Sequence, residues 1–271
     1  SLSLSLSLSL SLSLSLSGAN EDPAPNIGFC MQRAAELIQD FERTDDVVAS
    51  ISGKYTLKSE EFGRLRPKQF LSDECIGAYF ELLQHELASE AACHFSGKRF
   101  WFVEPMFLEK FKQRGYDYSK VKRWYRRMKQ TRPHLPSQID QLDMAFFRFH
   151  SGSHFSLFVV NFKQRRIEHY DSLDGSHEGK AEMVCRWLQQ YIADETSQDS
   201  NQTTFDFSGW CFYTPPTPQQ APSSMDCGVF VCQFSRLLAK TGSVLELEIT
   251  MADTARKRQT MLAGIMARKL L

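Results

Sequence analysis

Three segments with the character of β-strands follow one another in the middle of this chain and limit its possible folds. They cover residues 144–149, 155–162 and 166–171, which are rich in Phe, Val and Ile and are separated by short polar stretches. Segments with helical periodicity lie before and after this cluster, so helices and strands do not alternate strictly. This arrangement predicts a fold of the α+β class.

The helical segments carry apolar residues three or four positions apart. Ser72 and Asp73 cap a predicted helix whose apolar residues begin at Ile76. A second helix covers residues 177–193. The remaining expected elements are a helical segment within residues 29–51, a strand at 98–103, a basic helix within 112–132, a strand at 203–213, a helix at 227–240 and a final helix at 251–271.

The beginning of the chain differs in composition from the rest. Residues 1–17 repeat Ser-Leu with a period of two, and no turn or pairing partner is encoded beside them. Together with the linker that follows, we interpret residues 1–28 as an artificial or disordered leader and exclude them from fold reasoning. Residues 29–53 are expected to form a helical N-terminal extension, and residues 54–271 a single folded domain.

Composition and charge exclude several classes of protein. The chain has 32 basic and 32 acidic residues, which argues against an overall nucleic-acid binder. It contains no apolar run of 18 residues and no signal-peptide pattern, so neither a membrane span nor secretion is expected. Its seven cysteines are scattered without a C-x-x-C pair, which favours a reduced intracellular compartment and predicts no metal site.

A basic segment at residues 112–132 allows several interpretations. Its Lys and Arg residues are interleaved with aromatic residues, a combination found in nucleic-acid-binding proteins. However, Val121, Trp124, Tyr125 and Met128 are spaced as on one face of a helix. We therefore favour a helix with a solvated basic face. A docking patch for an acidic protein is the first alternative, and a nucleic-acid site is the second.

The chemistry of the chain centres on Cys227. This residue follows a polar loop with several prolines and opens the apolar run of residues 227–231. It therefore lies in the first turn of the predicted helix, where unpaired backbone N–H groups and the helix dipole favour a thiolate. Gly228 leaves the backbone beside the sulfur uncrowded. Cys227 is thus a candidate nucleophile, although a cysteine at a helix start is more often a core residue.

His154 and Asp171 are the candidate partners of this thiol. His154 begins the second strand of the cluster and Asp171 ends the third. If these strands are antiparallel neighbours, both side chains lie at the same end of the sheet, and Asp171 can orient the imidazole. Gln219 or Gln220 can donate its amide to an oxyanion, with the Cys227 N–H as the second donor. The order His, Asp, Gln, Cys is that of a thiol protease.

These residues lie in short motifs that match a known family. The motifs are His154-Phe155, Tyr170-Asp171-Ser172-Leu173, Pro218-Gln219-Gln220, Asp226-Cys227-Gly228-Val229-Phe230, an upstream Phe70-Leu71-Ser72-Asp73 and a basic helix at residues 256–271. Together they resemble the ubiquitin-like-protein-specific cysteine proteases of the SUMO protease type. The resemblance covers residues 57–271 and makes 54–271 the catalytic domain. It implies a papain-like fold, with a central, mostly antiparallel sheet flanked by helices and the nucleophile at a helix N-terminus.

The resemblance also implies a role for individual residues. The implied catalytic set is His154, Asp171 and Cys227, with Gln220 as the oxyanion donor. The implied substrate-binding residues are Phe70, Asp73, Phe155, Gln219 and Gly228. Neither a metal ion nor an organic cofactor is implied.

This chain departs from the family pattern in three ways, one of which is Met225, which stands where a small polar residue is common. Phe70 and Phe155 stand where the family usually has Trp, so the aromatic tunnel over a Gly-Gly tail is expected to be wider. The loop from Gln220 to Cys227 is one residue longer than usual and contains Pro222, which leaves Gln219 open as the alternative oxyanion donor.

The implied activity is hydrolysis of the bond after the C-terminal Gly-Gly of a ubiquitin-like modifier, in a conjugate or in a precursor. SUMO is the favoured modifier and partner, and ubiquitin or NEDD8 is the alternative. Two other classes stay open: an acetyltransferase of the same clan, and an inactive module that binds a modifier without cleaving it.

Overall fold

A five-stranded sheet and a two-stranded hairpin organise the protein. The computed structural model describes residues 26–39, 47–88, 99–104, 107, 116–132, 135–175, 178–197, 207–245, 251–268 and 270–271. The strands are β1 (Val47–Ile51), β2 (Tyr55–Lys58), β3 (Phe100–Phe102), β4 (Met144–Ser151), β5 (His154–Asn161), β6 (Arg166–Tyr170) and β7 (Cys211–Tyr213). The α-helices are α1 (Ile27–Gln39), α2 (Ser59–Gly63), α3 (Asp73–Ala88), α5 (Trp124–Thr131), α6 (Glu178–Ser197), α7 (Cys227–Thr241) and α8 (Met251–Ala267).

The larger sheet has the order β3-β4-β5-β6-β7. Its two central pairings, β4 with β5 and β5 with β6, are antiparallel, as expected for strands joined by short turns. Its two outer pairings, β3 with β4 and β6 with β7, are parallel. The sheet is therefore mixed, with an antiparallel centre, and the α+β class is confirmed.

The three predicted central strands are confirmed, whereas the outer strands are shorter than predicted. The strand expected at 98–103 covers three residues, as does the observed part of the strand expected at 203–213. Residues 203–206 lie outside the described chain. β3 pairs only with β4, and β7 pairs only with β6. Each outer strand therefore has backbone hydrogen bonds along one edge only, which stabilise a shorter strand.

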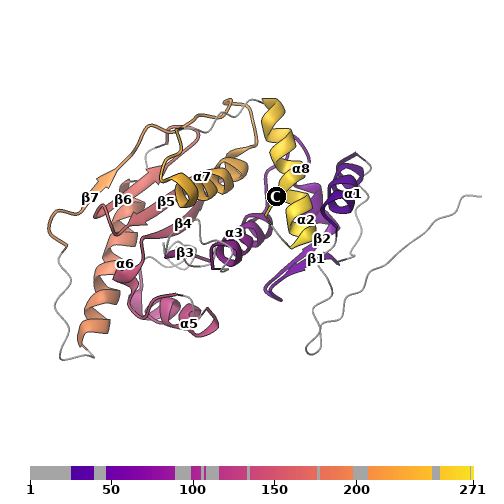
Figure 1. The fold of residues 1–271 in the computed structure, drawn as a ribbon. Helices are drawn as coiled ribbons and strands as arrows, with labels where there is room; N and C mark the ends of the chain where they lie inside the picture. Colours follow the sequence, from indigo (N-terminus) through magenta and orange to yellow (C-terminus); the bar gives the residue numbers. More distant parts are fainter. Residues whose placement is uncertain are drawn as a thin grey trace, which may run out of the picture.

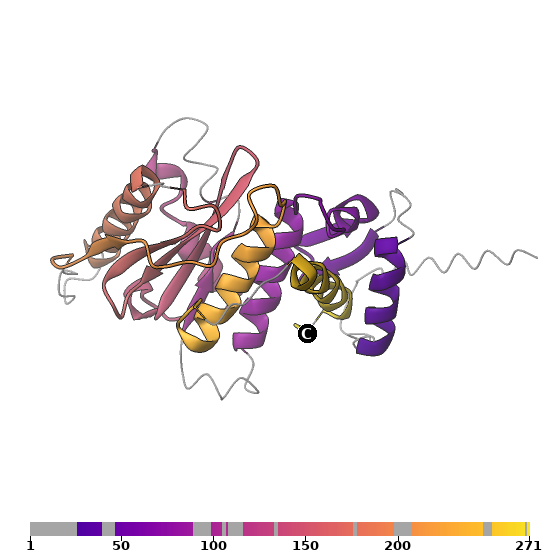
Figure 2. The ribbon, with the colours of Figure 1, turned by 90° about the horizontal axis from the view of Figure 1, so that it is seen from above.

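Alternating side chains divide the sheet into two faces, each covered by helices. On one face, Phe146, Leu157 and Val159 belong to a hydrophobic cluster shared with α3, α7 and α8, which we call the α3–α7 cluster. On the other face, Phe147 and Phe158 belong to a second cluster shared with α5 and α6. Figures 1 and 2 show α3 and α7 side by side between the sheet and α8.

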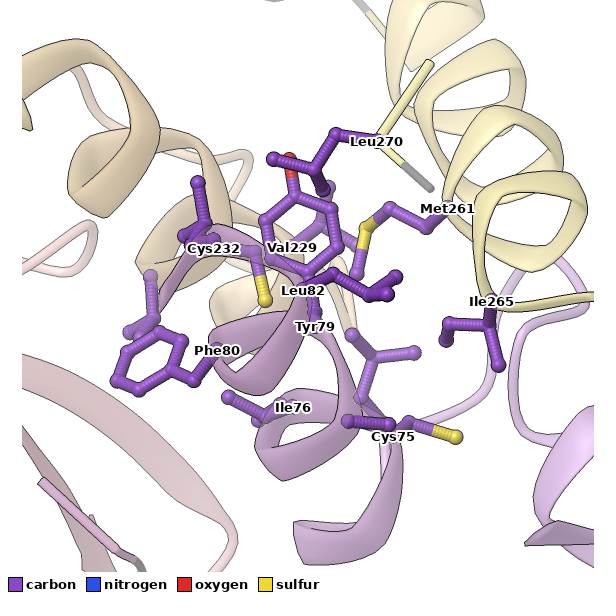
Figure 3. Packing of buried hydrophobic residues seen from close by; sticks show 14 of the residues in the cluster. Cys75, Ile76, Tyr79, Phe80, Leu82, Val229, Cys232, Met261, Ile265 and Leu270 are labelled. Carbon is purple, nitrogen blue, oxygen red and sulfur yellow. The ribbon is translucent and has the colours of Figure 1, made fainter. Parts of the chain in front are cut away.

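The α3–α7 cluster is tightly packed where the three helices meet. Figure 3 shows Ile76 and Tyr79 of α3 in one packed cluster with Val229 of α7 and Met261 of α8. These side chains are nearly inaccessible, and burying each aliphatic one stabilises the fold by roughly 1.5–3 kcal/mol. The cluster fixes the position of α7, whose first residue is Cys227.

The N-terminal part of the described chain packs on α8 and α3. Ala34 of α1 and Ile51 of β1 are buried in the α3–α7 cluster. The helix of this part ends at Gln39, and Val47–Ile51 forms a strand where helical character was expected. This strand is rich in β-branched residues and gains its hydrogen bonds from β2. The expected boundary between residues 53 and 54 falls in the turn of this hairpin.

The basic segment has the helical spacing that its sequence predicts. Within the described residues it contains a short 3-10 turn at Tyr118–Lys120 and then α5. Tyr125 and Met128 are buried, while Arg123 and Arg127 are exposed. In the described part of the chain, no helix is long and apolar enough to cross a membrane.

Candidate active site

Cys227 begins α7 and lies against the end of the β4–β5 hairpin. Its side chain is 2% exposed, and its Sγ lies 3.9 Å from the carbonyl oxygen of Ser153 in that hairpin. Asp226 occupies the N-cap position of α7. The sulfur therefore lies in the first turn of the helix, as the sequence predicts, where backbone N–H groups favour an anion.

The sheet brings His154 and Asp171 together. His154 is the first residue of β5, and Asp171 directly follows the last residue of β6. The antiparallel register pairs Leu157 with Tyr170, so both residues lie at the same end of the two strands. The His154 Nε2 and the Asp171 Oδ1 are 2.6 Å apart. The predicted proximity of these two side chains is therefore present in the structure.

The electrostatics of this group favour a charged imidazole. The hydrogen bond with Asp171, and then the contact with Cys227, raise the pKa of His154 to about 9 although burial opposes this shift. Burial alone would raise the pKa of Asp171, but hydrogen bonds from His154 and from the Leu173 N–H lower it below its ordinary value. A thiol, an imidazolium and a carboxylate in this arrangement can form and stabilise a nucleophilic thiolate.

The two glutamines of the loop before α7 have different surroundings. Gln220 is buried: its Oε1 accepts from Ser172 Oγ at 2.9 Å and its Nε2 donates to the Ser224 carbonyl at 3.0 Å. The exposed Gln219 donates from Nε2 to the carbonyls of Asp171 and Thr217, both at 2.9 Å. An amide nitrogen carries two hydrogens. Both are engaged in Gln219, whereas one hydrogen of Gln220 has no acceptor among the described residues.

A cleft of about 410 Å³ lies next to this group. Phe70 and Phe155 both line it, and so does Ser153, whose carbonyl contacts Cys227. Asp73 lines the cleft too, but its carboxylate forms an ion pair with Arg148 at 2.7 Å. The remaining lining residues are Glu60, Glu61, Arg64, Leu71, Ser72, Glu74 and His150. The structure therefore unites in one cleft the two aromatic residues that the sequence analysis assigned to the substrate tail.

Gly228 has a packing role in the structure. A Cβ at this position would lie 2.9 Å from the Leu71 Cβ and 3.0 Å from the Ile76 Cδ1, so only glycine permits this approach. Gly228 does not line the cleft. Its contact with substrate therefore stays a prediction.

Arg258 of α8 supports the site, and the sequence analysis did not identify it. Its guanidinium is 1% exposed and donates to Asp226 Oδ1 from Nε at 2.9 Å and from a terminal nitrogen at 2.7 Å. It also donates to the carbonyls of Arg64, Arg66, Gln69 and Met225. Arg258 therefore joins the segment before Phe70 to the segment before Cys227. The only signal in the sequence is its place in the basic run of residues 256–258.

Comparison with known proteins matches residues 69–267 to the Ulp1 protease family, C-terminal catalytic domain. The chain is 28% identical to a putative ubiquitin-like-specific protease 1B of Arabidopsis thaliana over 69% of its own length and 52% of that protein. It is 26% identical to a sentrin-specific protease of Caenorhabditis elegans over 78% of its own length and 27% of that protein. The chain thus spans about half or less of the length of these relatives.

Two solved structures show the same fold. One is the Ulp1 protease domain in complex with Smt3, the yeast ortholog of SUMO, with a TM-score of 0.65 and 21% identity over 93% of this chain and all of that one. The other is the Ulp1-like SUMO protease catalytic domain of Chaetomium thermophilum, with a TM-score of 0.69 and 18% identity over 90% of each chain. These similarities confirm the predicted fold.

Proposed function

This chain belongs to the Ulp1 protease family, and we propose that it is a thiol protease that cleaves after the C-terminal Gly-Gly of a ubiquitin-like modifier. The observation that carries the proposal is the hydrogen bond between His154 and Asp171, with Cys227 near enough to raise the pKa of His154, beside a cleft lined by Phe70 and Phe155. Residues 54–271 would form the catalytic domain, in a compartment reducing enough to keep the thiol free.

In the proposed reaction, the Cys227 thiolate attacks the carbonyl carbon of the terminal glycine. The His154 imidazolium then gives its proton to the departing amine, and a thioester joins Cys227 to the modifier. Water attacks the thioester while His154 accepts its proton, which releases the modifier acid and restores the Cys227 thiolate beside the His154 imidazolium. Asp171 holds the imidazole and stabilises its cation throughout.

Gln220 is the proposed side-chain donor to the oxyanion, together with the Cys227 N–H. Its burial and its remaining amide hydrogen support this role. Gln219 is less suited to it, because both of its amide hydrogens are bound to carbonyls. One of these bonds ends on Asp171, so Gln219 would steady the backbone of the proposed orienting residue.

Two features would determine the proposed specificity: steric selection of the Gly-Gly tail and binding of the modifier's folded body. In this proposal, the walls that Phe70 and Phe155 contribute to the cleft would leave room for glycine, whereas a Cβ on the tail would collide with them. The folded body of the modifier would contribute most of the binding energy through an interface of about 1,000 Å². SUMO is the favoured modifier, because the relatives include a sentrin-specific protease and a protease bound to a SUMO ortholog. Ubiquitin and NEDD8 are the alternatives.

Modifier probes with a C-terminal electrophile test the proposal. We expect the SUMO probe to label the reduced protein at Cys227 and the label to be absent from Cys227→Ser. Cys211→Ser is the matched control, because Cys211 is exposed at the sheet edge and should not affect labelling. Labelling by the ubiquitin or NEDD8 probe instead of the SUMO probe would assign that modifier as the substrate. A folded, reduced protein that reacts with none of the three probes would refute the protease assignment.

A further inference from the structure

The β4–β5 pair places three side chains on one face of the sheet, at the wall of the cleft. The register puts His150 directly opposite Phe155, and Arg148 lies two residues before His150. Residues two apart in a strand share a face, and diagonal neighbours across a strand pair are in reach of long side chains. Arg148 and His150 are thus both positioned to contact the ring of Phe155, the residue next to His154.

Arg148 lies behind the wall rather than on its surface. Its side chain is 2% exposed, and it is not among the residues that line the cleft. One terminal nitrogen lies 2.7 Å from the Asp73 carboxylate, and the other donates to the Asp73 carbonyl at 2.9 Å. Removal of a guanidinium from water is costly without such partners. Asp73 therefore fixes the guanidinium, and with it the start of α3, against β4.

The fixed guanidinium and His150 both contact the Phe155 ring. The central carbon of the guanidinium lies 5.5 Å from the ring centroid, within the range of a cation–π contact. The His150 ring stacks on Phe155 with centroids 4.1 Å apart and planes at 19°. The His150 Nδ1 also lies 3.8 Å from the Asp73 carboxylate. A phenyl ring has no polar atom of its own to anchor it, so these neighbours determine its orientation.

We propose that Arg148 is a positioning residue that determines specificity, because it holds the Phe155 ring as the wall that excludes any tail residue larger than glycine. This inference rests on the proposed function. It assigns Asp73 an internal role as the anchor of Arg148. Without the guanidinium, the ring can rotate away from the cleft and admit a Cβ.

The variant Arg148→Met tests this role, since methionine fills a similar buried volume without the charge. The readout is the kcat/KM for two fluorogenic modifier substrates, one ending in Gly-Gly and one in Ala-Gly. We expect the preference of the parent for Gly-Gly to fall by about ten-fold, the size of a discrimination by one methyl group. The pH profile should stay unchanged, because His154 and Asp171 keep their contact. Arg148→Lys should restore part of the preference.

Matched variants separate this effect from a general loss of stability. Arg126→Met is the same substitution at an exposed pair with Glu195 on the opposite face of the sheet, and it should leave the preference intact. If Arg148→Met does not fold, Asp73→Asn should produce the same loss of preference. An unchanged preference in a folded variant would overturn the inference.

A structural readout keeps the inference independent of the activity. Failure of the parent to hydrolyse the Gly-Gly substrate would count against the proposed function. In a crystal structure of Arg148→Met, we expect the Phe155 ring to be displaced from His150. A ring that stays stacked at its parental position would overturn the positioning role, whatever the activity.

Discussion

At the scale of single residues, His154 links the site to pH. Its hydrogen bond with Asp171 and its contact with Cys227 raise its pKa from 6.5 to about 9. The imidazolium is therefore present at neutral pH and is lost as the pH rises through about 9. The pKa of His154 is higher in the folded state than in the unfolded state. The stability that its pairing with Asp171 adds is therefore complete below about pH 6.5 and is lost as the pH rises through about 9.

We expect Asp171→Asn to move the alkaline limb of the kcat/KM profile to lower pH. The substitution removes the main cause of the raised pKa of His154, so the ring loses its proton earlier as the pH rises. A pH–rate profile of both proteins measures the shift. Asp174→Asn, three residues further along at an exposed position with a positive φ, is the control and should leave the limb in place. An unmoved limb in Asp171→Asn would mean that another group titrates there.

We expect Gln220→Ala to lower kcat on the order of 10²–10³-fold, the usual cost of removing one oxyanion donor. Gln219→Ala should have a smaller effect, because its amide hydrogens bind the Asp171 and Thr217 carbonyls. Steady-state kinetics of both variants decide between the two residues. A larger loss in Gln219→Ala would transfer the donor role to that residue.

The sequence predicts some of the site residues and misses others for a physical reason. His154, Asp171 and Cys227 stand at the ends of elements with clear periodicity, so their proximity follows from strand pairing and helix position. Arg148 contacts Asp73 across 75 positions of the chain, and Arg258 contacts Gln69 across 189. Arginine is usually a surface residue, so nothing local in the sequence indicates that these two are buried.

At the scale of secondary-structure elements, the approach of α7 to α3 determines where Cys227 lies. Gly228 permits this approach, since a Cβ would lie 2.9 Å from the Leu71 Cβ. The first turn of α7 therefore has no room for a side chain next to the proposed nucleophile.

We expect Gly228→Ala to lower the free energy of unfolding by about 1–3 kcal/mol, the typical cost of overpacking a core. Urea denaturation measures this change. Gly179→Ala is the matched control, because it is also a helical glycine but has no atom within 4 Å of the added Cβ. That variant should be neutral or slightly more stable. A Gly228→Ala protein as stable as the parent would show that α7 shifts without cost.

The boundaries of an element can be predicted from the sequence when its conformation depends on its own residues more than on tertiary contacts. The central strands β4, β5 and β6 are predicted well, because each alternates between two buried faces. The strand β1 is different: its apolar residues also fit a helical stripe, and only pairing with β2 decides the outcome. That pairing depends on tertiary contacts, which override weak local preference.

At the scale of the whole molecule, one hydrophobic cluster extends from α1 to the helix that carries Cys227. Cys30 and Ala34 of α1 are buried in the same α3–α7 cluster as Val229 and Val231 of α7. The segment that the sequence analysis treated as an extension therefore shares its core with the site. We propose that it unfolds together with the rest of the domain.

We expect Ala34→Glu to destabilise the whole domain in a single unfolding transition, since it buries an unpaired charge at a position that is 0% exposed. Thermal unfolding followed by circular dichroism and by activity should show both signals lost together. Phe29→Glu is the control on the same helix, because Phe29 is 59% exposed and tolerates a charge. Loss of helix signal with full retention of activity would indicate a separable extension.

The late position of Arg258 in the chain affects when a newly synthesised polypeptide can acquire its activity. Its partners lie 189 positions upstream at Gln69 and 32 positions upstream at Asp226. Neither can form its hydrogen bond with Arg258 until the ribosome has added that residue. A nascent chain with Cys227 already outside the exit tunnel still lacks the guanidinium that holds the two flanking segments in place. The growing polypeptide should therefore be unable to cleave anything until this arginine has emerged and docked.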